Sequence, residues 1–262
     1  MEPEEVLELI RSAPERYDSV RAALRYRGDG PTHKQIRERI ASTEAGRRAF
    51  NVSPQEALEA SSRPIDYPEP DGPFGWSCRA WQADEFHWRL ETDLPAGGVS
   101  ILASNGRMLS HAPPFGPHYM GRFWRHRGGG GSPEEDPWWF AQATDHYWSF
   151  YALRTDEICG ISHELSSLDL TVEDPVTWAG REAVRLRGVP GEGWDWGWDP
   201  DPLSWGAEEY EVVVDTKRGV LLRCASRLNG EDFDALEIEE VHFDEQFPED
   251  TFASRDPLPW RR

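Results

Sequence analysis

Tryptophan rings give this chain its clearest potential for binding chemistry. Residues 191–206 read GEGWDWGWDPDPLSWG and contain Trp194, Trp196, Trp198 and Trp205. The stretch is rich in glycine and proline, which predicts a loop. The first three rings alternate, so in an extended segment they point to one side. Such an apolar surface either forms a ligand site or packs on the rim of the protein's own sheet, and both interpretations stay open.

Carboxylates in the same loop could bind a cation or cleave a sugar. Asp195, Asp199 and Asp201 lie among the tryptophans, but the alternating ligands and turn glycine of an EF-hand are missing. Paired carboxylates beside aromatic rings are typical of a glycosidase. With 48 acidic residues in the chain, such pairs also arise by chance. A carbohydrate-active enzyme is therefore the weakest of the functions considered.

The spacings that catalysis and metal binding need are missing elsewhere. The chain has no G-x-S-x-G, no G-x-G-x-x-G and no P-loop sequence. None of its eight histidines forms an H-x-x-x-H pair. Cys78, Cys159 and Cys224 are widely spaced, without a C-x-x-C, and read as reduced thiols. We expect a non-enzyme with no catalytic residue, no metal site and no cofactor.

Charge and length restrict the class of protein further. The 262 residues carry a net charge of −20, which repels nucleic acid and anionic membranes. No stretch approaches the ~18 apolar residues of a membrane span, and the first residues lack the basic start of a signal peptide. The sequence as it stands predicts a cytoplasmic protein, with a longer exported precursor left open. The oligomeric state is not predicted.

The first half of the chain is expected to contain two helices and a strand. Residues 2–13 predict a helix, with Pro3 in its first turn and an apolar stripe of Val6, Leu7 and Ile10. A strand follows over 19–28. Residues 32–50, with Thr32 as the expected cap, predict a second helix of net charge +3. Its basic face either docks a protein partner or lies on the protein's own acidic strands.

Beyond a proline-rich surface connection at 61–75, the pattern changes to a period of two. In FHWRLE, Phe86, Trp88 and Leu90 face one way, and Asn105-Gly106 predicts a hairpin turn. A glycine run at 128–131 is the best candidate for a flexible break. Strand-like runs then follow from SLDLTV to FDALEIEEVHF. The sum predicts an antiparallel meander with one or two helices.

These segments, in this order, resemble the LolA/LolB-like superfamily of lipoprotein-localisation factors, which includes the amino-terminal half of RseB. The most specific part is YEVVVDTKRGVLLRCASRL with its closing acidic-Phe tail. FHWRLETDLPAGGVSILASNGRMLSHAPP is similar to the family's aromatic strand and hairpin, and WAGREAVRLRGVP to another of its strands. The sequence departs from the family pattern in the insertion at about 31–75, the loop at 191–206 and the missing export signal.

The resemblance implies one α+β, mainly β domain over residues 1–262, an unclosed antiparallel β-barrel, or half-barrel, covered by one or two helices. It further implies a non-catalytic protein whose apolar cavity binds a lipid-like or other hydrophobic ligand. A regulatory interaction module with a self-filled barrel is the alternative. The tryptophans expected to line the cavity or its lid are Trp88, Trp124, Trp148, Trp178, Trp194, Trp196, Trp198 and Trp205.

Overall fold

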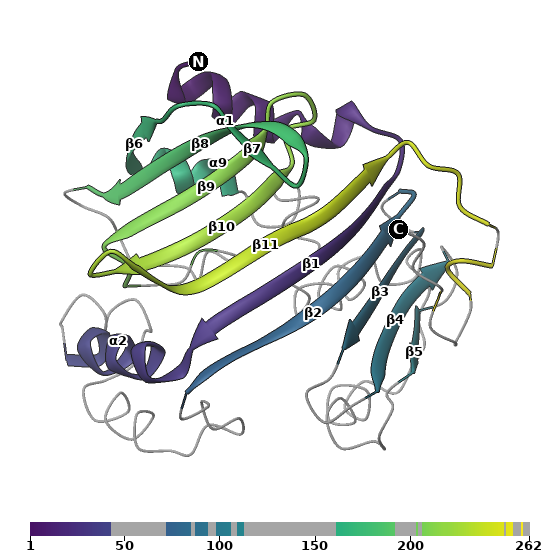
Figure 1. The fold of residues 1–262 in the computed structure, drawn as a ribbon, viewed down its shortest axis with the longest axis horizontal. Coiled ribbons are helices and arrows are strands. Elements are labelled where there is room, and N and C mark those ends of the chain that lie inside the picture. Colours follow the sequence, from purple (N-terminus) through teal and green to yellow (C-terminus); the bar gives the residue numbers. More distant parts are fainter. Residues whose placement is uncertain are drawn as a thin grey trace.

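The computed structural model shows one large open sheet with helices along one of its faces (Figure 1). The structure describes residues 1–42, 72–84, 87–93, 98–105, 109–112, 161–191, 203, 206–248, 250–253 and 258. The helices are α1 (Pro3–Arg11), the 3-10 turn η1 (Ala13–Arg16), α2 (Gly30–Ser42) and α9 (Ile161–Ser166). The strands are β1 (Val20–Asp29), β2 (Pro73–Gln82), β3 (His87–Asp93), β4 (Val99–Asn105), β5 (Leu109–Ala112), β6 (Leu168–Val172), β7 (Val176–Trp178), β8 (Arg181–Pro190), β9 (Glu209–Asp215), β10 (Leu221–Leu228) and β11 (Glu231–Phe243).

The sheet is antiparallel throughout and does not close on itself. Its order is β5-β4-β3-β2-β1-β11-β10-β9-β8-β6. Strand β7 pairs with the first residues of β8. Because β1 pairs with β2 on one side and with β11 on the other, the two ends of the chain meet in the middle of the sheet. This confirms the mainly β fold class and the unclosed barrel that the sequence predicts. The single-domain assignment stays a prediction.

The first helix forms where the sequence predicts it. Pro3 occupies the first turn, and Glu2 and Glu5 form a reciprocal capping box at its start. The apolar stripe is buried: Val6 and Ile10 are fully covered. These side chains pack with strands β6, β8, β9 and β10 and with α9. The short α9 is a helix that the sequence analysis did not anticipate.

Two predicted boundaries are corrected by the structure. The second helix begins at Gly30, and its cap is Asp29, whose carboxylate accepts the backbone N–H of Thr32 at 3.0 Å. Of the predicted helix, residues 43–50 lie outside the described part. Residues 73–75 belong to β2 and not to the surface connection, because Pro73 is the first strand residue, a position where a missing N–H is tolerated.

The two faces of the sheet have opposite chemistry. We call the face on which α1 and α9 lie the inner face and the opposite one the outer face. Along β1, buried and more exposed residues alternate: Ala22 and Leu24 point inward, while Arg25 and Arg27 point outward. The inner face carries the apolar core of the half-barrel, and the outer face carries charge.

Candidate binding surface

The inner face of β1, β2 and β3 forms an apolar platform. Pairing places Ala22 opposite Ala80, and Ala80 opposite Leu90, so one row of the platform crosses three strands. The next row continues with Leu24 and Cys78. We define these five residues as the apolar platform. Its central side chains, those of Ala22, Cys78 and Ala80, are small.

Aromatic rings border this platform at both ends. At one end Trp88 lies opposite Gln82 on β2. At the other end Tyr26 stacks on Trp76 with ring centroids 5.3 Å apart, and Phe74 packs against Tyr26 at 5.8 Å. The rings and the platform belong to one apolar cluster. They limit the length of the platform along the strands.

The platform side chains are buried, with Ala22 and Ala80 fully covered and Trp88 only 2% exposed. Among the described helices, α1 and α9 pack on the other half of the inner face, in a separate apolar cluster with β6, β8, β9 and β10. The inner face is thus divided into a helix-packed half and the half that carries the platform.

The structure separates the two predicted site tryptophans that it describes. Trp88 lies on the inner face beside the platform, as the alternation in FHWRLE predicts. Trp178 lies over the outer face: its indole N–H donates to the carbonyl of Ile238 at 3.0 Å, and Arg223 lies 5.7 Å from its ring centroid. The other predicted site residues lie outside the described residues: Trp124, Trp148, Trp194, Trp196, Trp198 and Trp205. The role of Trp88 in ligand binding stays a prediction.

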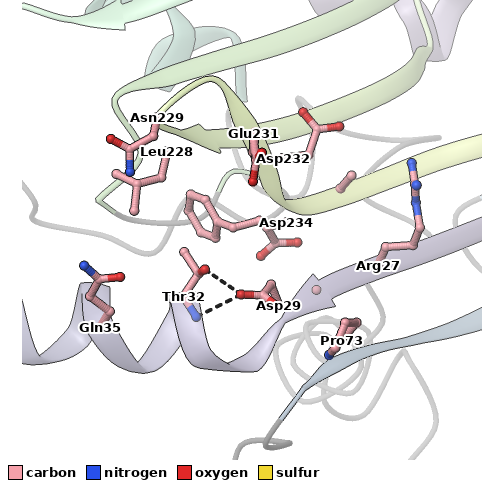
Figure 2. Close-up of a pocket in the computed structure, with 13 residues that line it drawn as sticks. Arg27, Asp29, Thr32, Gln35, Pro73, Leu228, Asn229, Glu231, Asp232 and Asp234 are labelled. Carbon is pink, nitrogen blue, oxygen red and sulfur yellow. Dashed lines mark hydrogen bonds between the residues drawn. The ribbon is translucent and has the colours of Figure 1, made fainter.

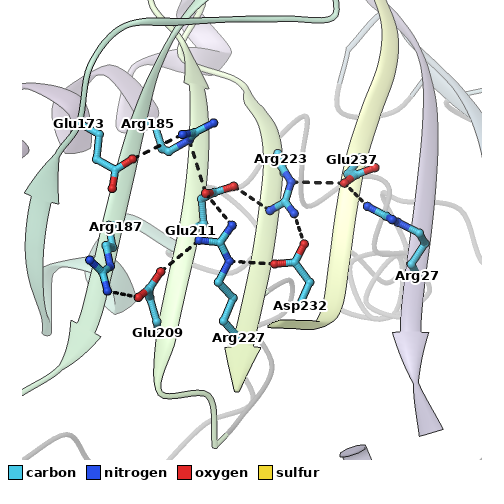
Figure 3. Close-up of polar contacts among 10 residues, drawn as sticks. All are labelled: Arg27, Glu173, Arg185, Arg187, Glu209, Glu211, Arg223, Arg227, Asp232 and Glu237. Carbon is cyan, nitrogen blue, oxygen red and sulfur yellow. Dashed lines mark hydrogen bonds and ion pairs between the residues drawn. The ribbon is translucent and has the colours of Figure 1, made fainter. Parts of the chain in front are cut away.

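The outer face carries a ladder of ion pairs across β1, β8, β9, β10 and β11 that extends to Glu173 just after β6 (Figure 3). Arg223 on β10 lies at its centre and pairs with Glu211 at 2.9 Å, with Glu237 at 3.3 Å, and with Asp232. Both Arg223 and Glu211 are less than a tenth exposed. The ladder, as we call it, comprises Arg27, Glu173, Arg185, Arg187, Glu209, Glu211, Arg223, Arg227, Asp232 and Glu237.

The ladder shifts the pKa values of two of its members, Arg227 and Asp232. Partial burial alone would lower the pKa of Arg227, but hydrogen bonds to Asp232 and Glu209 and the charge of Glu211 outweigh it and raise that pKa. Partial burial alone would raise the pKa of Asp232, yet Arg227 and Arg223 keep it below its ordinary value. Ion pairing across the strands thus favours the charged forms of Arg227 and Asp232.

A polar cleft of about 390 Å³ lies where β1 meets α2 and the β10–β11 turn (Figure 2). Three of its four acids serve the fold: Asp29 caps α2, Asp232 belongs to the ladder, and Asp234 lies 3.4 Å from the imidazole of His33. Within the described ranges no three His, Cys, Asp or Glu side chains gather as metal ligands would.

The described part of the basic helix contacts its own chain. The guanidinium of Arg39 donates to the carbonyl of Gly206 at 2.6 Å, and His33 faces Asp234. The imidazole ring of His33 also packs edge-on against the ring of Phe233, with the ring centroids 5.4 Å apart. These contacts agree with the interpretation that α2 lies on the protein's own strands. A protein partner for the helix stays a prediction.

The platform and the ladder were not identified from the sequence. The sequence does contain a pattern that indicates the ladder, because like charges recur with a period of two in two strand segments. These are Arg185 with Arg187, and Glu209 with Glu211. No sequence pattern predicts that Ala22 and Ala80 lie opposite each other, because 57 residues separate them along the chain. Among the described helices, none is long and apolar enough to cross a bilayer.

Comparison with known proteins finds similarity in structure but none in sequence. No family model matches the chain, and no curated protein is similar in sequence. MucB in complex with MucA(peri) is similar in structure, with a TM-score of 0.46 and 12% identity over 96% of this chain and 59% of that one. LprF from Mycobacterium bovis gives a TM-score of 0.42 and 9% identity over 94% and 95% of the two chains. A LolA superfamily protein from Nitrosomonas europaea gives 0.30 and 8% over 96% and 97%.

The open antiparallel half-barrel with helices on its inner face is the architecture that the sequence resemblance implies. The chain spans about 59–62% of the length of the MucB chains that it matches. At these identities the similarity concerns the fold, and no residue's role is carried to this chain.

Proposed function

We propose that this protein is a non-catalytic binding protein that holds an elongated hydrophobic ligand on the inner face of β1, β2 and β3. The observation that carries the proposal is the apolar platform, with its central residues Ala22, Cys78 and Ala80. Alanine and cysteine at the middle of a wide strand surface leave depth, where leucine or phenylalanine would fill it. Burying an acyl chain there would gain about 25 cal/mol for each Å² of apolar surface.

The character of the two faces supports binding over catalysis. The inner face offers apolar contact, and the acids and bases of the outer face are committed to one another. The LolA superfamily protein and MucB are similar in fold. The ligand class proposed here is a single acyl chain or a molecule of similar shape, because the platform is three strands wide and closed at both ends by rings.

A regulatory module with a self-filled barrel is the second candidate, and the burial of the platform favours it. Leu24, Cys78 and Leu90 are each at most 2% exposed. In that case the platform is ordinary core, and the protein acts through its surfaces. The two functions differ in a simple observable, which is whether an apolar molecule displaces or joins the groups that cover the platform.

Photoaffinity labelling with a diazirine-bearing long-chain fatty acid tests the proposal. We expect labelled peptides from β1, β2 and β3, with labelling suppressed by excess unlabelled fatty acid. Native mass spectrometry before and after organic extraction reports any ligand already bound. Labelling confined to outer-face peptides, or unaffected by the competitor, would overturn the proposal and favour the self-filled module.

A pair of adjacent substitutions provides the matched control. Ala22→Leu enlarges the platform floor, whereas Ala23→Leu adds the same atoms to the opposite face of the same strand. We expect fatty-acid affinity to fall about tenfold in the first variant, the effect of losing contact with one or two methylene groups. The second variant should bind as the unchanged protein does.

A further inference from the structure

Within the part of the chain that the structure describes, one edge strand of the sheet has main-chain N–H and C=O groups that pair with no other strand. Strand β6 ends the sheet order and, within the described residues, pairs only with β8. The N–H of Glu173 donates to the carbonyl of Arg185 at 2.9 Å. Because main-chain groups alternate along an antiparallel strand, Thr171 and Asp169 also direct theirs toward β8. The N–H and C=O groups of Leu168, Leu170 and Val172 therefore point away from the sheet.

The pairing partner of Leu168 supports this assignment. Leu168 lies opposite Pro190, which has no N–H to contribute to the sheet. A proline fits at a pair that exchanges no hydrogen bonds, and the alternation places one there. The main-chain groups of Leu168, Leu170 and Val172 are thus positioned to form hydrogen bonds with an added strand.

Two grooves run along this edge, one after the other. The first, of about 570 Å³, lies between the start of α1 and residues 166–171. The second, of about 580 Å³, continues from Val172 to Val176 beside Met1. Figure 1 shows β6 at the margin of the sheet next to the amino-terminal helix. The grooves lie beside β6, where an added strand would run about 5 Å from its neighbour.

The walls of the grooves are acidic. Glu2, Glu4, Asp169, Glu173 and Asp174 line them. Two of these five acids, Glu4 and Glu173, are already paired with nearby bases, and among the described residues the other three are not. Arg185 pairs with Glu173 and Glu211 at 3.5 and 3.4 Å, and Arg11 pairs with Glu4 and Glu8 at 2.9 and 3.2 Å. The edge therefore presents a net negative charge to an incoming chain.

The two sides of the edge strand differ, and this specifies the pattern of a partner. Asp169, Thr171 and Glu173 face outward with the ladder, whereas Leu170 and Val172 are half-buried against the apolar cluster under α1. Side chains of an added strand would lie beside these residues in alternation. The complementary segment alternates apolar residues with lysine or arginine.

We propose that the β6 edge binds an extended basic segment of another protein by strand addition, with apolar and cationic side chains in alternation. Main-chain hydrogen bonds to Leu168, Leu170 and Val172 give the affinity, and the acidic walls select the charge. A second copy of this chain is a poor occupant, because two β6 edges would bring Asp169 and Glu173 of each copy against the same acids of the other. The proposal does not depend on the ligand proposed for the inner face.

Amide exchange followed by NMR tests the strand addition directly. The probe is a blocked eight-residue peptide of alternating valine and lysine, and its matched control has glutamate in place of lysine. In the free protein we expect the amides of Leu170 and Val172 to exchange fast and that of Thr171 slowly. The valine–lysine peptide should protect Leu170 and Val172, and the glutamate peptide should protect neither. Binding that leaves these two amides unprotected overturns the proposal.

Charge-reversal variants locate the binding site independently. Asp169→Lys with Asp174→Lys should weaken the valine–lysine peptide about tenfold, the effect of two surface charge pairs lost and replaced by repulsion. Glu15→Lys with Glu231→Lys makes the same change of net charge at exposed positions elsewhere and should leave binding within about twofold. Equal loss in both double variants would show unspecific attraction to an acidic protein and would overturn the proposal, as would no binding at millimolar peptide.

Discussion

Arg89 and Glu91 form an ion pair on β3 that is completely buried, with Nε and Oε1 2.8 Å apart. Both side chains point to the outer face, where the carboxyl-terminal segment covers them. The backbone N–H of Leu258 donates to the same carboxylate at 2.7 Å, and Arg89 donates to the carbonyl of Thr251 at 3.3 Å. The pair thereby attaches the end of the chain to a strand near the sheet's other end.

Neutralising this carboxylate should destabilise the fold strongly. Glu91→Gln keeps the shape of the side chain but leaves Arg89 buried beside a neutral amide, a change that costs about 3–5 kcal/mol. Urea denaturation followed by fluorescence measures the free energy of unfolding. Glu239→Gln, which breaks an exposed pair with Arg25 at 3.8 Å, should change that free energy by less than about 0.5 kcal/mol. Equal effects of the two substitutions would contradict the buried pair.

The ladder should make stability depend on pH through Asp232. Partial burial opposes its charged form, but Arg227 and Arg223 hold its pKa below the ordinary value of 3.8. A carboxylate with a lowered folded pKa stabilises the protein fully above its unfolded pKa, and the contribution disappears as the pH falls through the folded pKa. We expect Asp232→Asn to cost about 1 kcal/mol at neutral pH, allowing for screening by solvent.

Measuring the stability of the Asp232→Asn variant over a range of pH tests the role given to Asp232. The stability difference between the protein and the Asp232→Asn variant should be constant from about pH 6 to 8 and should shrink below about pH 4. Urea denaturation at each pH gives the two free energies. Glu231→Gln, in the same hairpin but outside the ladder, should give a difference near zero throughout. A difference for Asp232→Asn that grows as the pH falls would refute the assignment.

Sequence patterns predicted the elements well because local alternation dictates them. The buried and exposed residues of β1 follow the period of two from Val20 to Asp29, and Val6 and Ile10 follow that of a helix. The cap of α2 was misassigned to Thr32 because aspartate and threonine have similar cap preferences, and only the structure shows Asp29 accepting the bond. The six-residue helix α9 is too short to carry a periodic signal.

Long-range pairing was beyond sequence reasoning, and the binding surface depends on it. Trp88 could be placed on an apolar face by alternation, but its neighbours across β2 and β1 could not. Trp178 was expected to line the cavity or its lid, and the structure places it over the outer face because it lies opposite Arg181 of β8, whose side chain is on that face. No property of residues 176–178 alone distinguishes the two faces.

The hydrogen bond of Trp178 should contribute measurably to stability. Trp178→Phe retains an aromatic ring but removes the N–H that donates to Ile238 and weakens the contact with Arg223. We expect a loss of about 1–2 kcal/mol in the free energy of unfolding. Trp76→Phe, where the ring stacks on Tyr26, should cost less because stacking survives the substitution. The reverse order would contradict the role given to the indole N–H.

Gly219 is the point where the β9–β10 turn touches the first helix. Its φ is +76°, and a Cβ added there would lie 2.0 Å from the carbonyl oxygen of Leu9 in α1. The left-handed backbone costs an alanine about 1–2 kcal/mol, and the collision must in addition push α1 from the sheet. We expect Gly219→Ala to lose about 3 kcal/mol or more of unfolding free energy. Gly230→Ala has a φ of +79° but meets nothing within 4 Å, so it should show the backbone cost alone. Chemical denaturation of both variants compares them, and equal losses would show that α1 does not lie against this turn.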